Sequence, residues 1–296
     1  MAIYTQKALT IEAQMQLLLS KNLIIKQPDD VKRCLNHIGY HRLKNYTYKF
    51  KDESQNFIPN TGFDQIIELY NFDRKLKFIL FEALELIEVA VKALISNQMS
   101  LAFGAHWYMQ EAHFAPDFDH VTFLNSLKLD FSNAEEGSAK AYKKYYHEPA
   151  LPPSWMAMEL ITFGTISKIF KYLAAREVKQ AICSHLKMPE NILVSWMHGF
   201  SLIRNRCAHH QRIVYRSLPI ELMLPQRQKH RFLMEADAVR TGSLYCALSC
   251  MAYLLDIASP GCHFKSDIFA LLNEYPHIHI KELGFTSHWQ SEAIWQ

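Results

Sequence analysis

The residues best suited to chemistry lie close together near position 204. Arg204 is followed five residues later by His209, in the pattern R-x-x-x-x-H. Histidine titrates near neutral pH and can move a proton, whereas arginine can hold a phosphate through two parallel hydrogen bonds. These two candidate catalytic residues therefore suit cleavage of an RNA phosphodiester by its neighbouring 2′-hydroxyl. The candidate supporting residues beside them are Asn205, His210 and Arg212.

The spacing of Arg204 and His209 limits how the two side chains can act together. On an ideal helix, residues five apart project about 140° away from each other. They approach one phosphate only if the helix ends near them, or if two copies of the chain build a composite site at a dimer interface. The alternative is a structural histidine, because a pattern of two residues is common by chance.

The formal charge of +3 is the sum of two short basic segments and an acidic remainder. Residues 1–51 hold nine Lys or Arg against three Asp or Glu, and residues 201–231 hold seven against one. The rest is acidic, with thirteen against eighteen in residues 52–200 and three against seven in residues 232–296. Basic stretches in an otherwise acidic chain favour a phosphate-bearing partner such as RNA, and the alternative is a solvated helix face.

Basic and aromatic side chains alternate between residues 39 and 51. Aromatic rings can stack on the bases of a single strand while Lys and Arg contact its phosphates. The candidate RNA-binding residues are Arg42, Lys44 and Tyr46 here, with Arg206 and Arg216 in the second basic segment. The alternative is that the tyrosine rings pack into the core and only the cations face water.

Composition favours an all-α protein, because glycine and proline, which tight turns require, number only 9 and 11 of 296 residues. The most apolar stretch, residues 78–91, contains three glutamates, so no membrane span is expected. The first twenty residues lack a basic region followed by a continuous apolar block. These features predict a cytoplasmic protein.

The six cysteines form no C-x-x-C pair, which predicts reduced thiols rather than disulfides or a metal site. A metal site can be imagined from Cys246, Cys250, Cys262 and His263. However, zinc ligands usually come as tight pairs in loops, and these residues lie in apolar helical sequence. We expect no metal and no other cofactor.

Hydrophobic spacing and capping residues predict the helices that must position these side chains. We expect a helix after a Thr10 cap, a second one capped by Asp29 or Asp30 and ending on Gly39, and a long helix over about 63–103. Further helices are expected from Pro189 toward residue 210 and over about 231–256. The more polar residues 104–153 are expected to be rich in loops.

This pattern divides the chain into three regions. Residues 1–62 form an N-terminal helical segment that is basic and aromatic. Residues 63–260 form a helical core that carries the R-x-x-x-x-H motif, and residues 261–296 form a packed C-terminal tail.

The sequence around the motif, LIRNRCAHHQRIVYR (202–216), resembles the signature of the Abi-like family of bacterial abortive-infection proteins, whose core is similar to HEPN ribonuclease domains. The resemblance extends over nearly the whole chain. It also includes IGYHRLKNYTYKF (38–50), FDRKLKFILFEALELIEVAVKALI (72–95), FGAHWY (103–108), ELITFGTISKIF (159–170) and YPHIHIKELGF (275–285).

The resemblance implies an all-α helical bundle with a HEPN-like core and additional N- and C-terminal helices. It implies a homodimer and a metal-independent endoribonuclease that acts during phage infection. Arg204 and His209 match the motif's arginine and histidine, Asn205 matches its polar second position, and Glu88 lies where the earlier long helix can offer a polar residue. A toxin of this kind would need restraint, which suggests an antitoxin partner or a regulatory RNA.

Two other readings use the same residues. A non-catalytic RNA-binding or sensor protein would use the basic surface without cutting, since function depends on the site and not on the fold. Nucleotidyl transfer has less support, because the sequence has no glycine-rich phosphate loop and no evident carboxylate pair for magnesium.

Overall fold

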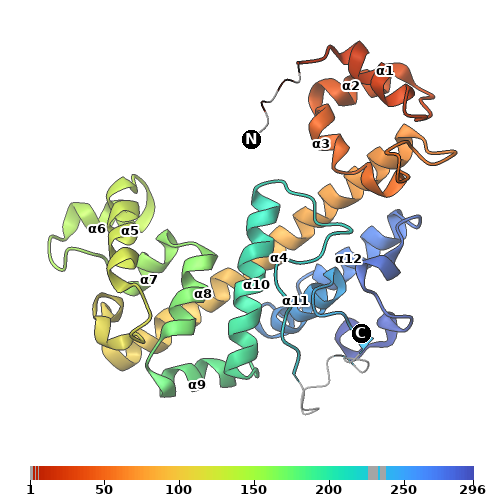
Figure 1. Cartoon of the computed structure of the whole chain (residues 1–296). Coiled ribbons are helices and arrows are strands. Elements are labelled where there is room, and N and C mark those ends of the chain that lie inside the picture. Colours follow the sequence, from red (N-terminus) through yellow and green to blue (C-terminus); the bar gives the residue numbers. More distant parts are fainter. Residues whose placement is uncertain (1–2, 4, 6, 226–232, 234–237) are drawn as a thin grey trace. The chain divides into compact units, whose positions relative to one another are not determined.

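A computed structural model describes residues 3, 5, 7–225, 233 and 238–296 (Figure 1). In these residues the regular structure consists of twelve α-helices and short 3-10 turns, with isolated bridges but no β-strand. The all-α class predicted from the composition is therefore confirmed. Among the described residues, no helix combines the length and the apolar character that crossing a membrane requires.

The helices follow one another from α1 to α12 along the chain. They are α1 (Ile11–Leu19), α2 (Pro28–His37), α3 (Tyr40–Lys44), α4 (Phe63–Phe103), α5 (His120–Asn133), α6 (Gly137–Tyr145), α7 (Ser154–Ala157), α8 (Phe163–Tyr172), α9 (Arg176–His185), α10 (Glu190–Ala208), α11 (Leu244–Ala258) and α12 (Phe264–Glu274). The long helix predicted over 63–103 is confirmed as α4, and the helix predicted after Pro189 is confirmed as α10.

The chain divides into two compact units, and the boundary falls within α4. The smaller unit consists of Met1–Phe78 and Ile268–Ile278. The larger unit consists of Ile79–Asp267 and His279–Gln296. Each unit has its own buried apolar side chains and is described separately below.

In the smaller unit, α1 lies against α2, and both begin with recognisable signals. The Thr10 hydroxyl accepts a hydrogen bond from the Ala13 N–H at 3.2 Å, which confirms the predicted cap. The predicted Asp29 or Asp30 cap of α2 is wrong, because the helix already begins at Pro28. Proline has no N–H to satisfy and a φ angle suited to the first helical position, so both aspartates lie in the first turn instead.

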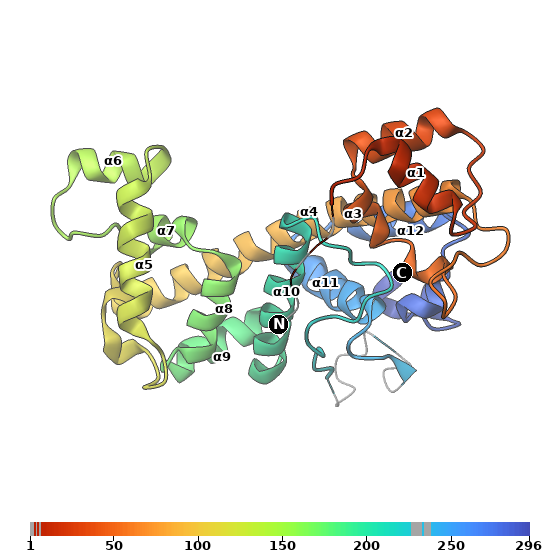
Figure 2. The same ribbon diagram turned by 45° about the horizontal axis from the view of Figure 1, so that its top comes forward.

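In the larger unit, α10 packs along α8 and also contacts α9 (Figure 2). Its apolar face is fully buried and includes Trp196, Met197 and Phe200. A loop segment lies directly against this helix, since the Trp196 Nε1–H donates to the Met223 carbonyl at 2.7 Å. Gly199 permits this close approach, because a Cβ atom there would lie 2.3 Å from Leu222 Cδ2.

The prediction of a loop-rich region between residues 104 and 153 is wrong for its middle part, where α5 and α6 form. The Asp119 carboxylate caps α5 by accepting the Thr122 N–H at 3.0 Å. Phe123, Leu127 and Phe131 then recur every four residues and are buried. Exposed apolar residues on other faces of α5, Val121 and Leu129, obscure the period of this short stripe in the sequence.

The helix predicted over 231–256 begins later than expected, at Leu244. Residues 239–243 are not helical, because the carbonyls of Thr241 and Gly242 accept hydrogen bonds from Leu222 and Leu218 instead. The Ser243 hydroxyl then accepts the Cys246 N–H and starts the helix. Most of residues 231–237 lie outside the described part of the chain.

Candidate active site

Arg204 lies near the C-terminal end of α10, and its guanidinium contacts two side chains of α4. Its Nε atom is 3.9 Å from the Glu88 Oε2 atom, and its Cζ atom is 5.9 Å from the centre of the Phe81 ring. Phe81 and Glu88 are seven residues apart, which places them on the same face of a helix two turns apart. These contacts leave the Arg204 side chain 32% exposed, so it is partly open to solvent.

A lysine of α4, Lys92, also contacts Glu88. The Lys92 Nζ atom is 2.8 Å from Glu88 Oε1 and donates a second hydrogen bond to the Ile161 carbonyl at 2.7 Å. The side chains of Glu88 and Lys92 are only 12% and 10% exposed. Glu88 thus bridges two cations, and the buried one holds its carboxylate in place.

His209 lies where α10 ends. It is the C-cap residue of the helix, and its side chain is exposed to solvent. The next two residues complete a Schellman motif, because the His210 N–H donates to the Cys207 carbonyl and the Gln211 N–H donates to the Arg206 carbonyl. The helix therefore ends directly at His209, which meets one of the two conditions under which both motif residues could approach one phosphate.

The backbone at His210 is strained. Its φ angle is +53°, in the left-handed region that a Schellman motif usually fills with glycine. Histidine tolerates this region better than most residues but still costs energy there. A non-glycine residue in this position beside a candidate catalytic histidine fits the tendency of strain to gather at functional sites.

The remaining predicted residues of the second basic segment lie on α10 and just after it. Asn205 and Arg216 are exposed, and Arg212 is partly buried. Arg206 donates to the Ser217 carbonyl at 3.0 Å, and burial followed by the charge of Arg216 lowers its pKa. The structure therefore groups these residues with Arg204, His209 and His210 in one unit.

Tyr215 anchors the segment that follows the motif. Its hydroxyl accepts a hydrogen bond from the His279 N–H at 2.9 Å, which ties this segment to the C-terminal part of the same unit. Burial raises the pKa of Tyr215 to about 12, so the phenol stays neutral at physiological pH.

The other three candidate RNA-binding residues belong to the smaller unit. Arg42 and Lys44 are exposed on α3. Tyr46 is 2% exposed, its hydroxyl donates to Asp73 Oδ2 at 2.7 Å, and its ring meets the Tyr70 ring edge-on. A base cannot stack on a ring buried in this way, so Tyr46 has a packing role in this structure.

The sequence predictions did not include two side chains of this cluster: Lys92, which contacts Glu88, and Phe81, which contacts Arg204. Lys92 had a usable signal, because a Glu and a Lys four residues apart on a helix commonly pair. Phe81 had none, since its contact with Arg204 depends on how α10 crosses α4. Glu82 and Glu85, on the preceding turns of α4, are exposed.

The cysteines are all free thiols, and burial raises the pKa of Cys250. Cys246 and Cys250 are buried in α11, whereas Cys262 is partly exposed. In the described part of the chain, no group of three or more His, Cys, Asp or Glu side chains could hold a metal ion.

The chain resembles a known protein family over a region that includes this site. The sequence profile of the Abi-like protein family matches residues 33–215, which is more than half of the chain. The chain therefore belongs to the Abi-like protein family. The match contains Glu88, Lys92 and the whole 204–212 segment. Family membership points to abortive infection, a defence against phage, as the process in which the protein acts.

Searches of curated proteins and of solved structures found no match.

Proposed function

We propose that this protein is a metal-independent endoribonuclease of phage defence, with Arg204 and His209 as its catalytic residues. The observation that carries the proposal is the position of Arg204. Glu88 and Phe81 hold its guanidinium at the surface, just before the point where α10 ends at the exposed His209. This activity is the one that the similarity to HEPN ribonuclease domains implies.

The reaction that these groups support is attack of a ribose 2′-oxygen on the adjacent phosphorus. The bond from phosphorus to the 5′-oxygen breaks, which leaves a 2′,3′-cyclic phosphate and a 5′-hydroxyl. One group must take the proton of the 2′-hydroxyl and another must protonate the departing 5′-oxygen, and histidine suits both roles. Arg204 would stabilise the negative charge that builds on the phosphate oxygens.

A homodimer would supply the second histidine. Phe81, which contacts Arg204, and Val89, two turns further along α4, are 42% and 55% exposed, so this strip of α4 presents two apolar side chains to solvent. If two copies paired across this strip, two Arg204 and two His209 side chains would surround one RNA strand. Light scattering is expected to give twice the monomer mass, and Val89→Arg is expected to halve it, because a charge would be buried at the interface.

The surrounding cations would hold the rest of the RNA strand. Arg206, Arg212 and Arg216 follow Arg204 in the larger unit, and Asn205 and His210 can hydrogen-bond to the ribose or phosphate. In the smaller unit, Arg42 and Lys44 are exposed and would contact RNA phosphates independently of this site. Because these contacts are electrostatic, RNA affinity is expected to fall steeply as salt concentration rises.

The test is incubation of the purified protein with labelled single-stranded and structured RNAs in excess EDTA. Wild type is expected to release 2′,3′-cyclic phosphate and 5′-hydroxyl ends, and Arg204→Ala and His209→Ala are expected to lose cleavage. Salt-sensitive binding with the RNA recovered intact would instead identify a non-catalytic RNA-binding or sensor protein.

A further inference from the structure

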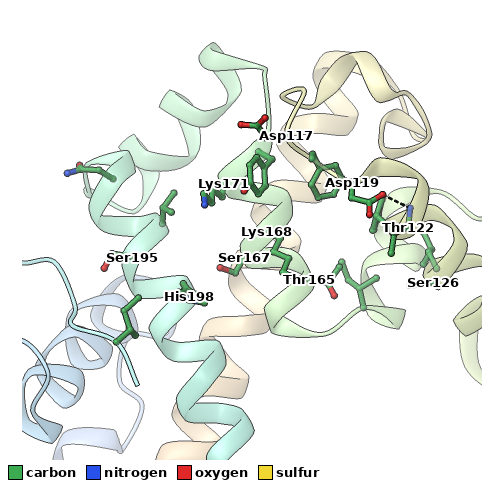
Figure 3. Close-up of a pocket in the computed structure, with 18 of the residues that line it drawn as sticks. Asp117, Asp119, Thr122, Ser126, Thr165, Ser167, Lys168, Lys171, Ser195 and His198 are labelled. Atoms are coloured by element: carbon green, nitrogen blue, oxygen red, sulfur yellow. Dashed lines mark hydrogen bonds between the residues drawn. The ribbon is translucent and has the colours of Figure 1, made fainter. Parts of the chain in front are cut away.

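A large cavity lies in the larger unit, apart from Arg204. Its volume is about 770 Å³, which is within the usual range of small-molecule sites. It is lined by α5, α8, α10 and the loop segment around Met223. Figure 3 shows Lys168 and Lys171 of α8 between Ser195 and His198 of α10 on one side and Asp119 and Thr122 on the other.

The lining combines the groups that a nucleotide needs. Lys168 and Lys171 are exposed cations one turn apart on α8. Phe118 and Tyr172 supply aromatic rings, with their centres 5.8 Å apart. The side chains that can hydrogen-bond to a ribose or a base are Thr122, Ser126, Thr165, Asn191 and His198.

One face of α10 connects the cavity with the candidate active site. On an ideal helix, Val194, His198, Asn205 and His209 lie within about 60° of one another. The first two line the cavity, whereas Asn205 and His209 are exposed beyond it. From His198 to His209 the helix rises about 16 Å, which is the length of a few nucleotides.

We propose that this cavity binds one nucleotide of the RNA strand, a few nucleotides away from the phosphate at Arg204 and His209. The inference rests on the proposed function insofar as RNA is the ligand, but it does not require that the RNA be cut. Its consequence is that the cavity sets which sequences bind productively.

The acidic side chains of the cavity orient that nucleotide. Asp117, Asp119 and Asp130 lie on or just before α5, so a phosphate there would be repelled. The phosphate therefore lies along Lys168 and Lys171, and the base points toward α5. Carboxylates accept hydrogen bonds from exocyclic amino groups, so cytosine is preferred over uracil.

The fourth carboxylate of the lining, Glu221, accepts a hydrogen bond from the Thr241 hydroxyl at 3.1 Å. It therefore already has a partner within the larger unit.

The test measures binding of labelled ten-nucleotide RNAs by fluorescence anisotropy. The double variant Lys168→Ala/Lys171→Ala is expected to bind at least about tenfold more weakly, because two phosphate contacts are lost. The slope of its plot of log affinity against log salt concentration is expected to be smaller in magnitude by about 1.4. The matched control is Lys128→Ala/Lys140→Ala, which removes two exposed lysines outside the cavity and should change affinity less than about twofold.

Two further measurements sharpen the result. Lys168→Arg/Lys171→Arg should restore affinity, which separates loss of charge from damage to the fold. Wild type should bind oligo(C) about fivefold more tightly than oligo(U), and Asp117→Ala should remove the difference. Equal affinity of wild type for both would overturn the assigned orientation of the base.

The outcomes separate this inference from the nuclease proposal. If wild type binds RNA through the two lysines but never cleaves it, the cavity assignment holds and the nuclease proposal fails. If wild type cleaves RNA and the Lys168→Ala/Lys171→Ala variant matches the control in affinity and in cut positions, the nuclease proposal holds and the cavity assignment is overturned.

Discussion

The same helix, α4, carries two carboxylate–lysine pairs with identical spacing in two different environments. In the smaller unit, Asp73 and Lys77 are 2.9 Å apart, and the Asp73 side chain is fully buried. In the larger unit, Glu88 and Lys92 are 2.8 Å apart and nearly as well buried. Both carboxylates also contact a third side chain, and that third contact is where the two regions differ.

The third contact of Asp73 is a neutral donor inside the core, the Tyr46 hydroxyl at 2.7 Å. The third contact of Glu88 is a cation, Arg204, which lies 3.9 Å away and is partly exposed. A buried carboxylate paired with a buried lysine is costly to break, so the first arrangement serves to maintain the fold. A carboxylate that steadies a solvent-facing guanidinium leaves a cation available to a ligand, which makes the second arrangement the candidate site.

The largest expected effect comes from breaking the buried pair. Asp73→Ala would leave the Lys77 ammonium and the Tyr46 hydroxyl without this acceptor in the core. We expect the free energy of unfolding to fall by about 3–5 kcal/mol, measured by urea denaturation. Glu88→Ala should cost less, because Lys92 keeps its hydrogen bond to the Ile161 carbonyl and Arg204 can turn to solvent. Equal losses in the two variants would remove the distinction between the regions.

A smaller effect, on activity, is expected at the second pair. Glu88→Ala would release Arg204 from its position, so we expect kcat/KM for RNA cleavage to fall by about 10- to 100-fold. Glu88→Gln should keep part of the activity, because the amide keeps the shape of the side chain beside Arg204 and loses only its charge. Glu85→Ala is the matched control on the same helix, since Glu85 is exposed. A loss of the same size in both alanine variants would contradict the positioning role.

Tyr46→Phe tests whether this tyrosine packs or binds RNA. The variant keeps the buried ring and loses the hydrogen bond to Asp73, so we expect the free energy of unfolding to fall by about 1–2 kcal/mol. RNA affinity, measured by anisotropy beside Lys44→Ala, should stay within about twofold of wild type for Tyr46→Phe. A loss of affinity in a variant that folds normally would assign Tyr46 to the RNA surface.

The smallest effect concerns the strained residue after His209. His210→Gly and His210→Ala both remove the imidazole, so they differ only in how well the backbone accepts a positive φ angle. We expect the glycine variant to be more stable than the alanine variant by about 1 kcal/mol, measured by urea denaturation. If the two are equally stable, the backbone at position 210 stores no strain.

Local signals in the sequence predicted much of the fold. The period of apolar residues in α4, the Thr10 cap of α1 and the end of α10 are properties of neighbouring residues, and the structure confirms them. The start of α11 could not be predicted in this way. It depends on hydrogen bonds between residues 241–242 and the distant residues 218–222.

The candidate site also depends on contacts between residues that are distant in the sequence. The motif itself indicated Arg204 and His209, because their residue types and spacing are visible in the sequence. The contact of Arg204 with Phe81 and the burial of Tyr46 against Asp73 are tertiary contacts, which no local pattern encodes. Sequence therefore indicated which residues could act, whereas packing decides which of them face solvent.

We expect Arg204 and His209 to cut RNA without a metal ion. The most direct test is cleavage of a labelled RNA by the full chain in excess EDTA, beside Arg204→Ala, His209→Ala and the Glu85→Ala control. Wild type and the control are expected to give 2′,3′-cyclic phosphate ends, and the two motif variants are expected to cleave at least about 10³-fold more slowly. Unchanged cleavage by folded Arg204→Ala and His209→Ala proteins would contradict it.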